Sequence, residues 1–295
     1  MALHCPSCNL SKYQYGSRIF IKFGFYRRTS DRRVIHRFKC KICDRTFSRA
    51  SFDPCFRQLK RQVNKSVFEH LASGNSQRRM AYLLRLNRKT VKRKFLFLGL
   101  QAKAHLYLHN LKLPKAQFVQ FDDLETFEHS KCKPLSVTLA VEGKSRRILG
   151  FAVSKMPAKG HLVKKSLKLY GVRKDERAKG RGRLFCSLQN LVEKNAIIQS
   201  DQNPHYPPDV KKYFPEASHL TIKGRRGAIT GQGELKKIEF DPLFSLNHTC
   251  AKLRSDVNRL IRKTWCTTKL ASRLELHLGI TALYHNQHLL MPKRV

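Results

Sequence analysis

Two short apolar runs that each end in aspartate place the strongest constraint on the fold of this chain. Residues 196–201 (AIIQSD) are followed by the cluster QNP, and residues 118–123 (FVQFDD) alternate apolar and polar positions before two acids. A short apolar run closed by polar residues and proline is typical of a buried strand. Each strand would carry a carboxylate at its C-terminal end, where open α/β sheets bind their ligands. The alternative is a pair of surface aspartates at ordinary strand ends.

The charge of the chain indicates an anionic partner. Sixty lysines and arginines against twenty acids give a formal net charge of +40 over 295 residues, which is typical of proteins that bind nucleic acid. A ribosomal protein or a basic regulator would show the same balance. The sequence has no apolar run of membrane-spanning length and no apolar segment after Met1, so we expect a cytoplasmic, nucleoid-associated protein without a membrane partner.

The first expected domain, residues 1–56, contains two C-x-x-C motifs about thirty residues apart. Nine cysteines, an odd number, without a secretory signal argue against a disulfide framework. The spacing predicts one structural zinc ion held by Cys5, Cys8, Cys40 and Cys43, with arginine-rich ribbon strands between the motifs. Four unpaired thiols are the alternative.

The second expected domain, residues 57–114, has the layout of a helix-turn-helix. A first helix ends near Gly74, Ser76 caps a second helix, and Asn87 caps a third that covers residues 88–96. The last helix would enter the major groove of DNA, and residues 101–114 are expected to be a linker. The DNA-binding residues predicted on the helix at 88–96 are Arg88, Lys89, Lys92 and Arg93. A plain three-helix bundle with a solvated basic face remains an alternative.

From about residue 115 the pattern changes to strands. Residues 118–123, 135–141 and 147–153 predict a three-strand meander. A helix follows at 160–170, then a basic glycine-containing stretch at 174–183, a helix at 184–194, the strand at 196–201, a short helix and a fifth strand at 219–223. This order is that of an RNase H-like mixed sheet flanked by helices, in which the first strand lies beside the fourth. The predicted class is therefore α/β, and the two aspartates would be neighbours.

The last segment, from residue 244 to about 289, is predicted to be helical. It carries basic residues at a spacing that suits contacts with phosphates, and a solvated helix face explains them equally well. The candidate DNA-binding residues here are Arg254, Arg259, Arg262 and Lys263.

Two carboxylates on neighbouring strands are suited to Mg²⁺, which prefers oxygen ligands and keeps other positions for water and phosphate oxygens. A pair of such ions supports phosphodiester transfer by activating the attacking oxygen and stabilising the leaving one. A basic surface around an acidic centre fits a polyanionic substrate. The pattern therefore favours metal-dependent chemistry on nucleic acid.

Nearly the whole chain resembles the small bacterial insertion-sequence transposases of the IS-one-like group. The resemblance depends most on residues 119–123, 199–201 and 253–264. It implies a zinc ribbon, a helix-turn-helix and an RNase H-like "DDE" domain of residues 115–295. It also implies that Asp122 and Asp201 bind catalytic Mg²⁺, with Asp123 as an alternate.

The third position of the DDE set departs from the family pattern. Counted back from residues 253–254, the family's glutamate falls on Asn247, whose amide supplies no charge. Glu234 lies thirty-three residues beyond Asp201, a separation that other DDE enzymes tolerate, but it belongs to an apparent insertion. Both remain candidates for the third catalytic residue.

The resemblance implies DNA recombination by transposition. The transposase would bind the terminal inverted repeats of an insertion sequence, in double-stranded DNA, and transfer strands into target DNA as a homodimer or higher oligomer. A DNA-binding protein without catalysis, such as a repressor or a decayed transposase, is the alternative that Asn247 favours.

Overall fold

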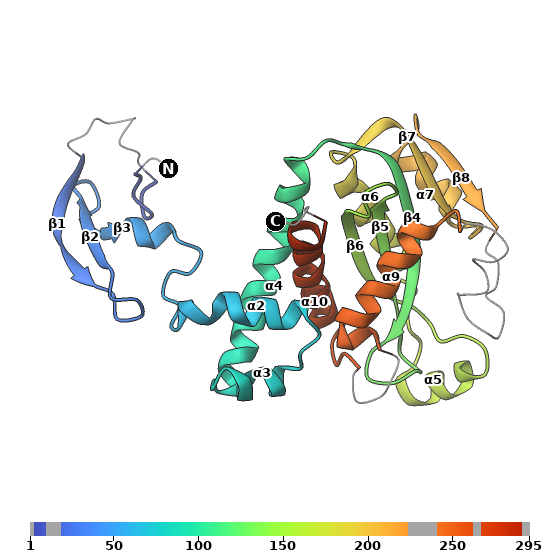
Figure 1. The fold of residues 1–295 in the computed structure, drawn as a ribbon, viewed down its shortest axis with the longest axis horizontal. Helices are drawn as coiled ribbons and strands as arrows, with labels where there is room; N and C mark the ends of the chain where they lie inside the picture. Colours follow the sequence, from blue (N-terminus) through green and yellow to red (C-terminus); the bar gives the residue numbers. More distant parts are fainter. Residues whose placement is uncertain (1–2, 10–18, 224–240, 262–266, 291–295) are drawn as a thin grey trace. The chain divides into compact units, whose positions relative to one another are not determined.

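The computed structural model describes residues 3–9, 19–223, 241–261 and 267–290 (Figure 1). The chain divides into two compact units, Met1–Ser66 and Val67–Val295. Each unit is described here by itself.

The first unit is a small three-stranded antiparallel sheet in the order β1-β2-β3. Its strands are β1 (Phe20–Arg27), β2 (Val34–Cys40) and β3 (Thr46–Ser48), and 3-10 turns follow at Arg49–Phe52 and Arg61–Val63. The core is small: among the described residues of this unit, its buried apolar members are Cys5, Ile19, Cys40 and Phe47. A unit with so little buried apolar surface depends on a cross-link or a metal ion for stability.

The second unit begins with three helices, as the sequence predicts. They are α2 (Asn64–Ala72), α3 (Gln77–Leu83) and α4 (Arg88–Leu111). The Ser76 hydroxyl accepts a hydrogen bond from the N–H of Arg79, and the Asn87 side chain accepts one from Lys89. Both predicted N-caps are therefore confirmed.

The linker expected at residues 101–114 is wrong, because α4 continues to Leu111. Ala102 and Leu106 are buried at helical spacing, and the first residue that cannot continue a helix is Pro114. Gly99 and Gly279 let α4 lie close to the C-terminal helix α10 (Ala271–Tyr284): a Cβ atom at Gly99 would lie 2.6 Å from that of Leu276. The three helices thus pack in one unit with the C-terminal helix.

A five-stranded mixed sheet forms the centre of the second unit, in the order β6-β5-β4-β7-β8. The antiparallel meander β4-β5-β6 confirms the predicted three strands, and β7 and β8 add parallel strands beside β4. The strands are β4 (Ala116–Phe127), β5 (Pro134–Glu142), β6 (Ile148–Lys155), β7 (Val192–Asp201) and β8 (Ser218–Ile222). The predicted class, α/β with a mixed sheet flanked by helices, is confirmed.

Helices cover both faces of this sheet (Figure 1). Helices α6 (Arg177–Leu188) and α7 (Tyr206–Tyr213) pack on one face, and α9 (Phe244–Asp256) on the other. The remaining elements are α5 (Leu162–Tyr170), a 3-10 turn at Asn258–Leu260 and a π-helical end at His285–Leu289. The main core lies under α6 and α7, where Phe121 of β4 contacts the rings of Phe185 and Tyr206 at 5.0 and 4.8 Å. Burying each such ring stabilises the fold by roughly 1.5–3 kcal/mol.

Two sequence-based boundaries in this unit are wrong. The acid-ended strand at 118–123 does not stop there, because residues up to Phe127 keep pairing with β5. The helix expected at 184–194 is instead α6 over Arg177–Leu188, which includes much of the basic glycine-containing stretch at 174–183, and β7 begins at Val192. Gly180 and Gly182 sit inside α6 because any side chain would collide with Ser154 and Tyr213. These glycines permit close packing and do not mark a turn.

Candidate active site

Asp122 and Asp201 occupy equivalent positions on the neighbouring parallel strands β4 and β7. The paired residues nearest the acids are Val119↔Ile198 and Gln120↔Gln199, so each aspartate lies two residues beyond the last pair. Side chains two residues apart share a face of a strand. The Gln120 amide donates to Gln199 at 2.9 Å across that face. The expected adjacency of the first and fourth strands is thus confirmed.

Helix α9 is held over this face by the same glutamine. Gln120 donates to the carbonyl of Pro242 at 2.8 Å and accepts from the N–H of Leu246 at 3.1 Å. These bonds satisfy a side chain that is 2% exposed. Gln120 is two residues before Asp122 in β4, so these bonds also hold the start of α9 near Asp122.

The environment of Asp122 opposes a lone negative charge. Burial, together with the nearby charge of Asp201, raises the pKa of Asp122 to about 6. Hydrogen bonds from the N–H of Asp123 at 2.6 Å and the hydroxyl of Tyr206 at 3.1 Å oppose that rise. Two carboxylates that disfavour each other's charge form a site that a cation would stabilise.

Two groups around the pair show how it is enclosed. Burial, with the charges of Asp123 and Asp122, raises the pKa of the Tyr206 hydroxyl, which therefore stays a hydrogen-bond donor. On α9, burial and the charge of Asp122 raise the pKa of the Cys250 thiol to about 12. Asp122 thus lies between α7 and α9, while Asp201 ends its strand.

Asp123, the alternate in the sequence, points the other way. It follows Asp122 in the strand, so it shares the opposite face with Phe121. There it accepts a hydrogen bond from the Thr138 hydroxyl and lies 3.7 Å from the guanidinium of Arg181. Arg181 is itself 3% exposed and also bonds Asp209 at 2.7 Å. A buried ion pair explains Asp123, and Asp122 is the better metal ligand.

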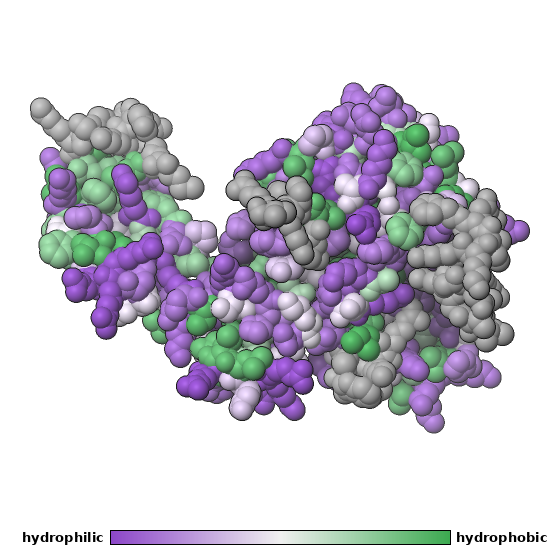
Figure 2. All heavy atoms as spheres, viewed as in Figure 1, coloured by the Kyte–Doolittle hydropathy of each residue, from purple (hydrophilic) through white to green (hydrophobic). Residues whose placement is uncertain are grey.

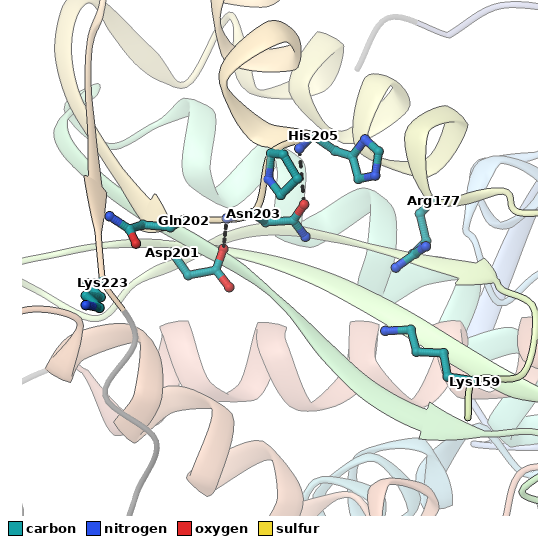
Figure 3. A pocket seen from close by; sticks show the side chains of 8 residues that line it. Lys159, Arg177, Asp201, Gln202, Asn203, His205 and Lys223 are labelled. Atoms are coloured by element: carbon teal, nitrogen blue, oxygen red, sulfur yellow. Dashed lines mark hydrogen bonds between the residues drawn. The ribbon is translucent and has the colours of Figure 1, made fainter. Parts of the chain in front are cut away.

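Asp201 opens onto a pocket of about 660 Å³ rimmed by cations. Figure 3 shows Lys159 and Arg177 on one side of Asp201 and Lys223 on the other. One Asp201 oxygen accepts the N–H of Asn203 at 3.0 Å, which fixes the carboxylate by an Asx-turn. A carboxylate held at the edge of a cationic hollow suits an anionic substrate.

Of the two candidates for the third catalytic residue, the structure describes only Asn247. The Asn247 amide donates to a carboxylate oxygen of Asp241 at 2.8 Å, and Glu234 lies outside the described residues. Asp241 also accepts the N–H of Leu243 at 2.9 Å and precedes Pro242, the residue bonded to Gln120. Sequence reasoning missed Asp241, although Asp-Pro directly before an apolar helical segment is a recognisable helix-start signal.

The predicted DNA-binding residues lie in several settings. Those at the start of α4 are exposed: Arg88, Lys89, Lys92 and Arg93. Arg254 is exposed on α9. The guanidinium of Arg259 lies over the Phe95 ring, 5.5 Å from its centroid, so it has a packing role whatever else it contacts. Arg262 and Lys263 fall outside the described residues.

The four predicted zinc ligands come together in the first unit. The sulfur atoms of Cys5, Cys8, Cys40 and Cys43 all lie within 4.8 Å of one another. Cys5 and Cys43 are 3.5 Å apart, and Cys8 and Cys40 are 3.8 Å apart. A tetrahedral zinc with bonds of about 2.3 Å requires sulfur separations of about 3.8 Å. The donor set and its dimensions therefore fit one Zn²⁺.

Among the described residues, these cysteines are the only group of three or more ligands close enough for one ion. Within the same described residues, no third His, Cys, Asp or Glu side chain lies close enough to Asp122 and Asp201 to share one ion with them.

No helix in the described part of the chain is both long and apolar enough to cross a membrane. A scan against models of protein families finds no match, and a search of curated proteins finds none either.

Proposed function

We propose that this protein is a transposase of the DDE type, which cleaves and transfers DNA strands at the ends of an insertion sequence. The observation that carries the proposal is the register of Asp122 and Asp201. They share one face of adjacent parallel strands, and the pKa of Asp122 is raised by burial and by its neighbour. A DNA-binding protein without catalysis gains nothing from a half-buried acidic pair beside a pocket that Lys159, Arg177 and Lys223 line.

The strand order supports an RNase H-like fold for the second unit. An antiparallel meander whose first strand also pairs in parallel with the fourth gives the order β6-β5-β4-β7-β8. That order matches the arrangement expected from the resemblance. In it the acids of the first and fourth strands meet on one face, as they do here.

The donor chemistry of the pair fits Mg²⁺. Carboxylate oxygens are its preferred protein ligands, and it keeps several positions for water and substrate phosphate. When bound, the metal would stabilise charge on the oxygens of a phosphodiester under attack. The chain's own contributions are to hold Asp122 through Tyr206, to fix Asp201 through Asn203, and to place α9 through Gln120.

The start of α4 supports a helix-turn-helix that grips DNA. Arg88 and Lys89 lie at the positive end of a helix dipole, where cations are unfavourable. Together with Lys92 and Arg93 they are exposed, so a phosphate backbone would relieve the repulsion. The terminal inverted repeats and the target DNA are the proposed duplex partners, bound by a homodimer or higher oligomer at the nucleoid.

The test is strand cleavage by Asp201→Asn. The variant keeps the shape of the side chain and the oxygen that accepts from Asn203, but it removes the charge. We expect DNA affinity to persist while cleavage and transfer of terminal-repeat duplexes, with Mg²⁺ or Mn²⁺, fall by orders of magnitude. Asp123→Asn is the matched comparison: because Asp123 belongs to a buried ion pair, it should lower stability more than chemistry.

A second candidate function, DNA binding without catalysis, is favoured by the absence of a third close ligand among the described residues. The same assay separates the two. Wild-type cleavage from Asp201→Asn would refute the catalytic proposal. No cleavage by the wild-type chain with either metal would support the non-catalytic DNA-binding protein.

A further inference from the structure

The sheet of the first unit packs on one face near Cys40 and is open on the other; toward Phe25 and Val34, which are 68% and 48% exposed, the packing face is open as well. Cys40 and Phe38 of β2 point toward the buried cluster with Phe47. The residues that alternate with them in β2, Arg37 and Lys39, therefore point away. The open face is defined here as Ile21, Phe23, Tyr26, Ile35, Arg37 and Lys39, from β1 and β2.

A bulge in β1 decides which aromatic ring belongs to the open face. Lys22 pairs with Phe38 and Phe25 pairs with His36, so Phe23 and Gly24 together stand opposite Arg37. Gly24 has a φ of +69°, the conformation that a glycine bulge requires. As a result Phe23 and Phe25, two residues apart, lie on opposite faces.

Ring contacts agree with this assignment. The Arg37 guanidinium lies over the Phe23 ring, 5.4 Å from its centroid, and is anchored by a 2.8 Å hydrogen bond to the Thr46 hydroxyl. On the other face, the Phe25 ring lies 6.3 Å from that of His36. The open face therefore presents an aromatic ring already stacked on a fixed guanidinium.

The open face exposes much more apolar surface than solubility favours. Ile21 is 41% exposed, Phe23 45% and Tyr26 39%. Figure 2 shows apolar residues interspersed with hydrophilic ones on the surface of this unit. Exposed aromatic side chains held side by side on a sheet mark a binding surface.

The charge around the open face selects the kind of partner. Residues 20–48 contain nine cations and two acids. The acids, Asp31 and Asp44, are already paired with Arg28 and Lys39. The nine cations are Lys22, Arg27, Arg28, Arg32, Arg33, Arg37, Lys39, Lys41 and Arg45. A partner must therefore be anionic and offer flat apolar groups.

We propose that the open face binds unpaired nucleobases of a single nucleic-acid strand, by stacking on Phe23 and Tyr26 while the surrounding cations contact its phosphates. Aromatic platforms in a basic setting bind single strands in this way, because every base has a flat π-face that duplex pairing hides. This function is separate from the catalysis proposed above. It gives the chain a site for melted or nicked ends.

The experiment uses the full chain loaded with zinc. Its affinity is measured by fluorescence anisotropy for a labelled oligothymidylate, the matching oligouridylate and a duplex of equal length, at moderate salt to limit non-specific attraction. We expect Phe23→Ala to weaken single-strand binding about tenfold or more and to leave duplex binding unchanged. The oligothymidylate and oligouridylate arms decide between DNA and RNA.

Phe25→Ala is the matched control, because Phe25 is an exposed aromatic of the same strand on the opposite face. It should leave single-strand affinity unchanged. Photocrosslinking of an oligonucleotide with 5-iodouracil should label the peptide of residues 23–27 in the wild type. Zinc content, measured for every variant, separates loss of binding from loss of folding.

Three outcomes would overturn the proposal. Phe23→Ala with normal zinc content could bind single strands as tightly as the wild type. It could lose duplex and single-strand affinity equally, which would indicate a duplex-binding face. Photocrosslinks absent from residues 23–27 in a wild-type chain that still binds the oligonucleotide would place the strand elsewhere on the protein. None of these readouts depends on cleavage, so a failure here is distinct from a failure of the catalytic proposal.

Discussion

At the scale of single residues, a carboxylate that lowers the unfolding free energy of the metal-free protein can indicate a metal site. Asp122 has a pKa of about 6, whereas an unfolded aspartate titrates near 3.9. The folded protein therefore holds a proton that the unfolded chain releases between these values. Stability from this group is full below about pH 4 and is lost as pH rises through about 6.

We expect Asp122→Asn to stabilise the metal-free protein at neutral pH. The shift of about two pKa units corresponds to about 3 kcal/mol, and an uncharged amide avoids that loss. The measurement is the unfolding free energy of the second unit in both proteins without added Mg²⁺, from about pH 4 to 7. The difference in unfolding free energy between Asp122→Asn and the wild type should grow as pH rises. Mg²⁺ should reduce that difference by stabilising only the wild type. A pH-independent difference would contradict the prediction.

Asp241 carries a second residue-scale prediction, because it lies at the start of α9 beside the residue that Gln120 holds. If Asp241 supplies the third carboxylate, Asp241→Asn should lower cleavage by roughly a hundredfold while keeping the side-chain oxygen that accepts from Leu243. Asn247→Ala, which removes only the bond to Asp241, should have a smaller effect. Glu234→Gln with no activity would assign the role to Glu234.

At the scale of elements, a buried histidine joins the first and last helices of the second unit. His277 of α10 donates to the carbonyl of Leu71 in α2 at 2.9 Å, and its ring lies edge-on to Phe95 of α4. Burial lowers the pKa of His277 to about 4. This depressed pKa makes the packing of the three helices sensitive to acid.

We expect the second unit to lose about 3 kcal/mol of stability as pH falls from about 6.5 to 4 through His277. The unfolded chain binds the proton near 6.5 and the folded chain only near 4, so the stabilisation is complete above 6.5. His277→Gln keeps a donor for Leu71 and does not titrate. Chemical unfolding across this range should show a flatter profile for His277→Gln. Equal slopes in the two proteins would refute this role.

Elements with a local signal could be predicted from sequence, and those set by packing could not. The caps at Ser76 and Asn87 and the paired cysteines are local, so they were predicted correctly. The length of α4 depends on burial against α10. The glycines within α6 are explained by its contacts with Ser154 and Tyr213, which the sequence does not show. In the site, the adjacency of the first and fourth strands could be predicted from the order of elements. The contact of Asn247 with Asp241 could not, because it depends on the packing of the segment before α9.

At the scale of the whole molecule, the division into two units predicts two unfolding events. The unit Met1–Ser66 has a small core and four cysteines placed for one metal, so we expect zinc to supply its folding free energy. The unit Val67–Val295 has its own large core. A chain of this kind does not unfold as a single two-state system.

A chelator should therefore unfold the first unit alone. We expect purified protein to contain about one zinc per chain, and Cys40→Ser to release it. Near-UV circular dichroism and limited proteolysis should then show residues 1–66 opened and the second unit intact. Cys186→Ser, which changes an exposed cysteine outside the cluster, is the matched control. Zinc-free protein that keeps a protease-resistant first unit would contradict the prediction.

Because the net charge is +40, the salt dependence of affinity is the most sensitive test of the DNA binding proposed for the chain. Each phosphate contact adds roughly −0.9 to the slope of log affinity against log salt. A fragment of residues 1–110 is a poor test, because it would remove α10 from α4 and expose the packing surface around Gly99. In the full chain, Lys92→Ala should reduce the slope by roughly one contact and weaken all duplex sequences alike.

The matched control is Lys103→Ala on the same helix, because Lys103 is already paired with Glu275 at 2.5 Å. Its removal should leave the slope unchanged, since an occupied cation releases no counterion on binding. Lys92→Arg should restore the slope by restoring the charge. Equal slopes for Lys92→Ala and the wild type would place the DNA away from the start of α4. The helix-turn-helix proposal would then fail, even if the aspartate pair proved catalytic.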